Sequence, residues 1–487
     1  MLYNATMRKF IETEDGKNWE IIFSEYEKML EWFHSFMTDS TGERYKVEKS
    51  QGERLQEYKA QIKRMRIFLD FIGNPQDNFL SVHIAGTGGK GSTSMMIGKI
   101  LEGMSARVGV HTSPFLQIPG EKFLINGQMI APSKFVEVVQ KLKISYEKFK
   151  KVYPDIDLKY AEIWVAFTYL YFGISNLNWA VIETGMGGRF DPTNILNPEL
   201  SVITNINFDH VPQLGTTIPE IAWHKAGIIK PGKPIITGED KEGALRVFRE
   251  ETERNESELY CFGSNFSWKL VSKGKIGAVI DVRAPYNNYE KILIPLLGVF
   301  QVENAALAIA TVDIIAHKHN LQIDSSIINE QFQEINFPGR MEIIQNNPTV
   351  ILDGAHNPQK MAALAKSMRE LYPDKKYILI CGMLGTKDSR SSIVHLLSQA
   401  EKVVISKPQV AGKPGMEARD LAKIVRETGY QGEIKICPEI SLAITEVLEK
   451  ADSEAIVLIT GSLYMLGEAR EYWIRTEDLL LQAEKHK

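Results

Sequence analysis

Residues 81–93, SVHIAGTGGKGST, combine the residue types that a phosphate-binding loop needs. An apolar run typical of a buried strand comes first, and a segment with helical spacing follows. Glycines let backbone N–H groups approach a phosphate closely, a lysine neutralises its charge, and a Ser or Thr hydroxyl reaches a phosphate-bound Mg²⁺. We therefore predict a nucleotide-phosphate loop, although an ordinary glycine-rich turn also fits the pattern. Its members are Gly86, Thr87, Gly88, Gly89, Lys90, Gly91, Ser92 and Thr93.

A carboxylate follows the strand expected at residues 179–182. Glu183 opens the sequence ETGMGGRFDPTN, and ligands of parallel sheets bind beyond the carboxyl ends of the strands. Beside a phosphate loop, Glu183 is a natural Mg²⁺ ligand, whereas alone it is equally typical of a surface acid before a turn. Arg189 and Asp191 lie in the loop that follows, and we expect them to face a substrate.

A histidine follows the next expected strand, LSVITNIN. His210 would lie at the same edge of the sheet as Glu183, which makes it a second candidate metal ligand. A histidine that takes part only in hydrogen bonds explains the pattern equally well.

The segment TTIPEIAWHKAGII places a lysine among the apolar residues of one helix face. A capping box from Thr217 to Glu220 predicts where this helix begins. Lys225 can extend its ammonium group to solvent along that face. Alternatively, burial lowers its pKa and the neutral amine takes up CO₂, which gives a carbamate that can bind Mg²⁺ through oxygen.

Further candidates lie beyond residue 300 and are weak individually. They are Asn304 in GVFQVENAALA, Arg340 in FPGR, and Asp353 and His356 in ILDGAHNP. The last two follow an expected strand and precede a helix N-terminus. The sequence contains no Ser-His-Asp nucleophile elbow, zinc motif or dinucleotide-binding GxGxxG.

The elements that position these residues alternate between strands and helices, which predicts an α/β protein with parallel sheets. Residues 17–75 are expected to be helical and to precede the phosphate loop. Residues 258–297 have strand periodicity without helices, which predicts a small antiparallel appendage. The Pro-Gly pair in INFPGRMEII interrupts the helical pattern, and alternation then restarts. We expect a P-loop, nucleotide-binding domain at 1–336, a linker at 337–343 and a smaller Rossmann-like domain at 344–487.

Composition restricts the function classes. The chain has 487 residues, 24% of them charged, and a net charge of -4, which does not indicate binding to nucleic acid or to an anionic membrane. No apolar stretch is long enough for a signal peptide or a membrane span. Three widely separated cysteines suit a reducing compartment, so we expect a cytoplasmic protein, and a monomer.

The motifs, taken together and in order, resemble those of folylpolyglutamate synthases and dihydrofolate synthases of the Mur ligase superfamily. They are GTGGKGS, ETGMGGRFDPTN, DH followed by HKAGIIKPG, QVENAA, FPGR, LDGAHNP and GSLYMLGEAR. The resemblance runs from roughly residue 25 to residue 475. It implies an ATP- and Mg²⁺-dependent ligase that converts a folate carboxylate to an acyl phosphate, which the amine of L-glutamate then attacks.

The resemblance also implies roles for individual residues. Lys90 would bind the phosphates, Ser92 and Glu183 would bind one Mg²⁺, and His210 and a carbamylated Lys225 would serve the second. Lys90, Lys225 and His210 are thus the expected catalytic residues. Asn304, Arg340 and Asp353 would hold ATP, and His356 would close on glutamate from the second domain. Ser113, Pro114 and Phe115 would line the pterin side of the substrate site.

Several positions depart from the family pattern. Phe115 stands where relatives usually have histidine, Gly88 stands where they have asparagine, and Phe300 and Gln301 replace a His-Gln pair. A pterin loses hydrogen bonds against phenylalanine, so we expect folylpolyglutamate synthesis to outrun dihydrofolate synthesis. Two alternatives stay open: a Mur-type ligase acting on a non-folate carboxylate, and an inactive nucleotide-binding regulator.

Overall fold

A computed structural model describes residues 19–37, 50–208, 211, 213–274, 276–385, 388–409 and 415–485. His210 lies outside the described residues. The expected N-terminal helices are α1 (Trp19–His34) and α2 (Gln51–Phe71), and α2 begins with a capping box between Ser50 and Glu53. No helix in these ranges is long and apolar enough to cross a membrane.

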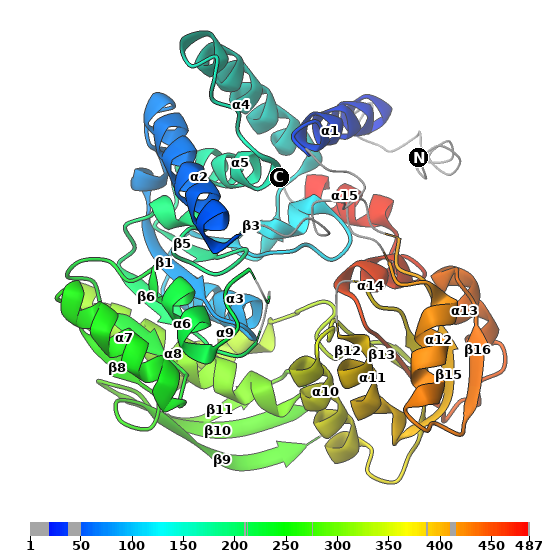
Figure 1. Cartoon of the computed structure of the whole chain (residues 1–487). Helices are drawn as coiled ribbons and strands as arrows, with labels where there is room; N and C mark the ends of the chain where they lie inside the picture. The colour runs from blue at the N-terminus through cyan, green and yellow to red at the C-terminus, as the bar shows by residue number, and fades with distance from the viewer. Residues whose placement is uncertain are drawn as a thin grey trace.

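An eight-stranded sheet forms the centre of the first unit (Figure 1). Its strand order is β4-β3-β2-β5-β1-β6-β7-β8, and β2, β5, β1, β6, β7 and β8 run parallel. The parallel strands are β1 (Leu80–Ala85), β2 (Val108–His111), β5 (Trp179–Glu183), β6 (Leu200–Ile203), β7 (Ile235–Thr237) and β8 (Leu259–Cys261). The short strands β3 (Phe123–Ile125) and β4 (Gln128–Met129) extend one edge antiparallel.

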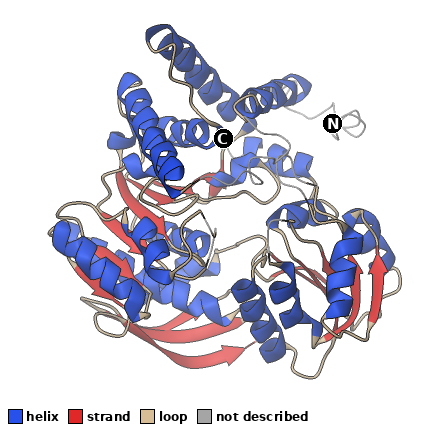
Figure 2. Ribbon diagram, in the orientation of Figure 1, coloured by secondary structure: helices blue, strands red, loops and turns tan. Residues whose placement is uncertain are grey.

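Helices cover both faces of this sheet, as Figure 2 shows. Its central strands β5 and β6 are therefore buried along their whole length. The helices that follow α2 in this unit are α3 (Lys90–Gly103), α4 (Pro132–Val152), α5 (Tyr160–Gly173), α6 (Ile218–Ala226), α7 (Glu242–Arg254), α8 (Val299–His319) and α9 (Ser325–Gln333). Of these, α4 packs on α1 and α5, and α9 packs on α3 and on the later strand β11 (Asn288–Ile294). Single 3₁₀ turns lie at η3 (Pro75–Asn78), η4 (Pro119–Lys122) and η5 (Pro192–Ile195). The expected α/β class is confirmed.

The antiparallel appendage is a three-stranded sheet of β9 (Ser267–Gly274), β10 (Gly277–Arg283) and β11 (Asn288–Ile294). It begins later than the sequence pattern suggested. The first strand of the expected segment, β8, instead pairs parallel with β7 in the large sheet. Strand periodicity identifies a strand but not its partner, which explains the difference.

A six-stranded sheet forms the second unit, in the order β12-β13-β17-β14-β15-β16. Its strands are β12 (Glu342–Asn346), β13 (Thr349–Asp353), β14 (Tyr377–Cys381), β15 (Ala400–Ile405), β16 (Glu433–Ile436) and β17 (Ile456–Thr460). The helices between them are α10 (Pro358–Leu371), α11 (Ser389–Leu397), α12 (Ala418–Glu427), α13 (Ile440–Leu448) and α14 (Leu463–Arg470). All strands but the edge strand β12, which runs antiparallel to β13, match the expected ones. The exact domain division stays a prediction.

The last helix, α15 (Thr476–Lys485), leaves the second unit and packs on α4 of the first (Figure 1). Leu480 joins the apolar core formed by α1, α4 and α5. The Glu484 carboxylate accepts hydrogen bonds from the backbone N and the Oγ of Ser133, at 2.8 and 2.7 Å, and so satisfies a free N–H group of the first turn of α4. The chain therefore crosses between the two units twice.

Candidate active site

The glycine-rich loop joins the carboxyl end of β1 to the N-terminus of α3, as the sequence predicted. Gly86 and Gly89 have positive φ, 146° and 79°. A Cβ on Gly86 would lie 1.8 Å from Thr204 Oγ1, and one on Gly89 would lie 2.1 Å from Asn304 Oδ1. Both positions therefore require glycine, and Asn304 of α8 reaches the loop.

Residues that follow β6 form hydrogen bonds with the phosphate loop. Asn205 Oδ1 accepts a hydrogen bond from Gly88 N at 2.9 Å, and Thr204 Oγ1 donates one to Gly88 O at 2.6 Å. The hydroxyl of Thr87 donates to Asn207 O at 3.1 Å. Sequence reasoning missed these supports, although their place at the carboxyl end of a parallel strand was a usable signal.

Glu183 lies at the end of β5 and faces the loop lysine. Its Oε1 is 3.5 Å from Lys90 Nζ, and its Oε2 accepts a hydrogen bond from Ser113 N at 3.1 Å. Burial raises the pKa of Glu183, and the positive charge of Lys90 opposes that effect. A Cβ on Gly91 would lie 3.3 Å from Glu183 Oε2, so the start of α3 approaches the carboxylate closely. The structure thus brings Lys90, Glu183 and Ser113 together.

A buried carboxylate beside a phosphate loop has the donor chemistry that Mg²⁺ prefers, and Ser92, buried in the same first turn of α3, would add an oxygen. Within the part of the chain that the structure describes, no three His, Cys, Asp or Glu side chains form a group able to hold a metal. The remaining ligands would have to come from phosphate oxygens, water or the segment around His210.

Lys225 lies directly behind the phosphate loop. The expected capping box of Thr217 and Glu220 begins α6, and Lys225 on this helix is 1% exposed. Its Nζ donates a hydrogen bond to Gly86 O at 2.8 Å. The side chain is therefore buried rather than extended to solvent, and its carbamylation stays a prediction.

The segment between the two units also reaches the loop. A Cβ on Gly91 would lie 3.1 Å from the Phe337 ring, and the guanidinium carbon of Arg340 lies 5.4 Å from the centre of that ring. Burial lowers the pKa of Arg340, while the negative charges of Asp353 and Glu183 oppose the shift. The Asp353 carboxylate accepts hydrogen bonds from Met341 N and Ala355 N, at 3.0 and 2.8 Å. The second unit thus contributes charge next to Glu183.

Other predicted residues have partners of their own. Arg189 forms an ion pair with Glu251 at 2.9 Å and stacks over Trp223. Asp191 accepts hydrogen bonds from Thr193 and Met186 and caps η5, and burial raises its pKa. Both shape the loop after Glu183, and their contact with a substrate stays a prediction.

His356 lies near Lys360 on the second unit, with Nε2 3.4 Å from Lys360 Nζ and Nδ1 2.8 Å from Gly354 O. Pro114 is exposed and Phe115 half-buried at the mouth of the Ser113 loop. Their contact with a substrate stays a prediction.

Sequence reasoning missed Lys122. Its Nζ lies 4.9 Å from the centre of the Trp164 ring, and burial lowers its pKa to about 8 despite the attraction of Asp191 and Glu183. A lone lysine at the end of a short turn gives no sequence signal for such burial.

The chain matches two family models: the Mur ligase middle domain over residues 159–312, and the Mur ligase glutamate ligase domain over residues 339–463. It is 31% identical over 409 residues to a dihydrofolate synthase/folylpolyglutamate synthase of Bacillus subtilis, covering 84% of this chain and 94% of the relative. It is 32% identical to a folylpolyglutamate synthase of Lacticaseibacillus casei, with 84% and 93% covered. The chain belongs to the folylpolyglutamate synthase/dihydrofolate synthase family.

Solved structures agree with this assignment. A Mycobacterium tuberculosis folylpolyglutamate synthase complexed with ADP has a TM-score of 0.82 at 25% identity, with 93% of this chain and 99% of that chain covered. A folylpolyglutamate synthase–AMPPCP–folate complex has a TM-score of 0.75 at 27% identity, with 92% and 98% covered. As a member of this Mur ligase family, the chain is an ATP-dependent ligase.

Proposed function

We propose that this ligase joins L-glutamate to the carboxylate of a folate at the expense of ATP. The observation that carries the proposal is the meeting of Lys90, Glu183 and the Ser113 backbone at the end of the parallel sheet, with Arg340 beside them. A relative named folylpolyglutamate synthase and a folate-bound structural neighbour give the substrate class.

The proposed reaction has two steps, the formation of an acyl phosphate and the formation of an amide. A carboxylate oxygen of the folate attacks the γ-phosphorus of ATP. As this O–P bond forms, the bond between the γ-phosphorus and the β–γ bridging oxygen breaks, and the products are an acyl phosphate and ADP. The amine of glutamate then attacks the acyl carbon, phosphate departs with the electrons of the C–O bond, and a proton of the attacking amine passes to the released phosphate. Both steps depend mainly on positioning and charge stabilisation.

Individual residues would divide this work. The N–H groups of the 86–91 loop and Lys90 would hold the phosphates, and Asn304, Arg340 and Asp353 would hold the nucleotide from the facing side. Glu183 and Ser92 would bind one Mg²⁺ and His210 would bind the second, and these ions would supply charge neutralisation at the phosphates. His356 would approach glutamate from the second unit. The proposal includes a monomeric protein in the cytoplasm, and the three unpaired cysteines support the reducing compartment.

ADP release tests the proposal. The reaction of ATP, tetrahydrofolate and L-glutamate should release ADP faster than blanks that lack either substrate, and mass spectrometry should detect a folate heavier by one glutamyl residue. Release without folate extension, together with inactivity on dihydropteroate, would instead indicate a ligase for a non-folate carboxylate. Absence of ADP release with every acceptor would indicate the nucleotide-binding regulator.

A further inference from the structure

Arg470 ends α14 and is the last residue of the GSLYMLGEAR motif, to which no role has yet been given. It is only 4% exposed. Its Nε donates to both carboxylate oxygens of Glu342, at 3.0 and 3.2 Å, and its Nη1 donates to Gln117 Oε1 at 2.5 Å. One guanidinium thus bonds to the second unit and to a loop of the first.

Each partner of Arg470 leads to the active site. Glu342 Oε2 accepts a hydrogen bond from Gly339 N at 2.8 Å, directly before Arg340. Gln117 lies in the loop whose first residue, Ser113, donates its N–H to Glu183. Arg470 therefore connects the segment that carries Arg340 with the loop that binds Glu183.

The 113–117 loop is fastened to the second unit by further contacts. Gln117 Nε2 donates to Ile474 O at 2.8 Å and to Glu471 Oε2 at 3.0 Å. Leu116 packs against the apolar core of α13, α14 and β17. A Cβ on Gly467 would lie 2.0 Å from Leu116 O, so the loop backbone lies directly on α14.

We propose that Arg470 and Gln117 are positioning residues for the ligase reaction. Together they tie the 113–117 loop to the second unit, so that the Ser113 N–H that binds Glu183 and the Arg340 guanidinium keep one fixed arrangement. The proposal rests on the proposed function, because it needs a reaction that uses both units. Among the described residues, the hydrogen bonds of Gln117 go neither to the phosphate loop nor to Arg340, so nucleotide binding should depend little on Gln117.

Gln117→Leu is the decisive variant. It removes the neutral amide from the inter-unit contacts and leaves the buried Arg470–Glu342 pair intact. Gln345→Leu is its matched control, because Gln345 Oε1 accepts a hydrogen bond from Trp473 Nε1 at 2.8 Å entirely within the second unit. Both glutamines are half-buried and both lose hydrogen bonds on substitution, but of the two only Gln117 bonds from one unit to the other.

We expect Gln117→Leu to lower kcat by about ten- to a hundredfold, since small misplacements of catalytic groups cost that much. The equilibrium dissociation constant for ADP should change less than about twofold, whereas Gln345→Leu should retain wild-type kcat. Arg470→Met should lower kcat by a larger factor in the wild-type enzyme than in the Gln117→Leu variant, because the two residues act as a unit.

Wild-type kcat in Gln117→Leu, equal losses in Gln117→Leu and Gln345→Leu, or additive effects in the double variant would overturn the positioning role. Thermal unfolding of each variant excludes loss of folded protein as the cause. Inactive wild-type enzyme on every acceptor would refute the proposed function instead, so the two failures are distinguishable.

Discussion

At the scale of single residues, the buried Lys225 is expected to affect turnover much more than stability. Lys225→Met keeps the aliphatic stem but removes the hydrogen bond to Gly86 O and any carbamate. We expect turnover to fall by at least about a hundredfold, the size of one lost electrostatic contact in a transition state. The lost hydrogen bond should cost stability only about 1–2 kcal/mol. Steady-state rates, with and without an added short carboxylate, measure this. Wild-type turnover in the variant would contradict a catalytic role.

Glu183 makes stability and activity oppose each other. Its pKa is raised in the folded protein, so its contribution to stability is complete below the unfolded-state pKa and is lost as pH rises through the folded-state pKa. Glu183→Gln should therefore unfold at a higher temperature than the ligand-free wild type at pH 7, and the difference should shrink in acid. Thermal unfolding between pH 4 and pH 8 measures this.

The same variant should lose about 3 kcal/mol of transition-state stabilisation and much of its Mg²⁺ dependence. Full activity of Glu183→Gln at low Mg²⁺ would remove Glu183 from the metal site. His210→Ala should also lower transition-state stabilisation and Mg²⁺ dependence, in this case through the second Mg²⁺.

Phe115 bears on which folate is used. It offers an apolar ring where relatives usually have histidine, and an unmatched polar edge of a pterin costs about 1–3 kcal/mol. We expect a higher kcat/KM with tetrahydrofolate than with dihydropteroate, and Phe115→His should narrow that ratio. Side-by-side rates on the two substrates decide this, and a preference of the wild type for dihydropteroate would reverse our ordering.

At the scale of elements, α14 depends on a glycine for its approach to the 113–117 loop. Alanine favours an isolated helix over glycine by about 1 kcal/mol, yet a Cβ on Gly467 would collide with Leu116 O. Gly467→Ala should therefore lower both kcat and the unfolding temperature. Gly52→Ala in α2 is the control, because a Cβ there meets nothing within 4 Å, and it should leave kcat unchanged. Equal behaviour of the two variants would refute the close contact.

The sequence predicted these elements unevenly, for physical reasons. The phosphate loop and the capping box of α6 were predictable because glycine, lysine and capping residues act over a few neighbouring positions. Helical periodicity placed Lys225 on the apolar face of α6, but it left open whether the ammonium group reaches solvent, and the structure shows that it is buried. The pairing of β8 and the burial of Lys122 were not predictable, because both depend on residues distant in the sequence. The same holds for Arg470, whose partner Gln117 lies in the other unit.

For the whole molecule, the return of α15 to the first unit is an element of stability. Glu484→Ala removes two hydrogen bonds at the N-terminus of α4 and should cost about 1–3 kcal/mol. Asp478 lies on the same helix as Glu484 and forms an exposed ion pair with Arg475, which directly precedes the helix. Asp478→Ala should cost at most about 0.5 kcal/mol of stability. Thermal or denaturant unfolding compares them, and equal losses would show that the α15–α4 contact carries no stability.

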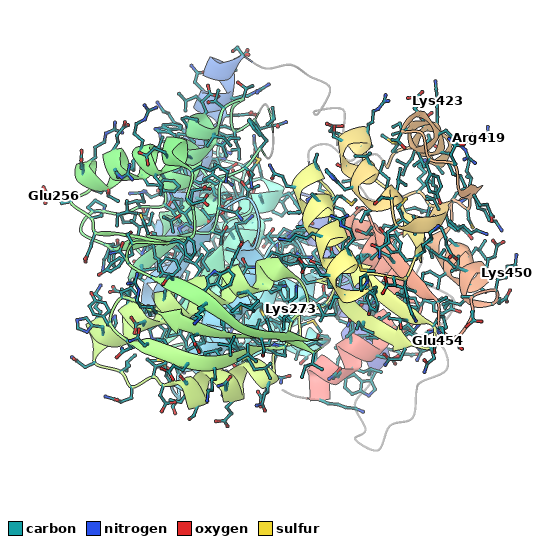
Figure 3. All side chains as sticks on the ribbon, turned by 90° about the horizontal axis from the view of Figure 1, so that it is seen from below. Glu256, Lys273, Arg419, Lys423, Lys450 and Glu454 are labelled. Carbon is teal, nitrogen blue, oxygen red and sulfur yellow. The ribbon has the colours of Figure 1, made fainter. Side chains whose placement is uncertain are left out.

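The two crossings of the chain between the units also restrict how the units can move. One crossing precedes β12 and the other follows α14, where Gln117 bonds to Ile474 O. We expect a rigid-body rotation of the units to turn about the line that joins these two crossings. Contacts close to that axis would move little during such a rotation, whereas contacts far from it would separate. An ion pair joins Lys273 of β9 to Glu370 of α10, and Figure 3 labels Lys273 where β9 approaches the second unit; we expect this pair to break when the units rotate apart.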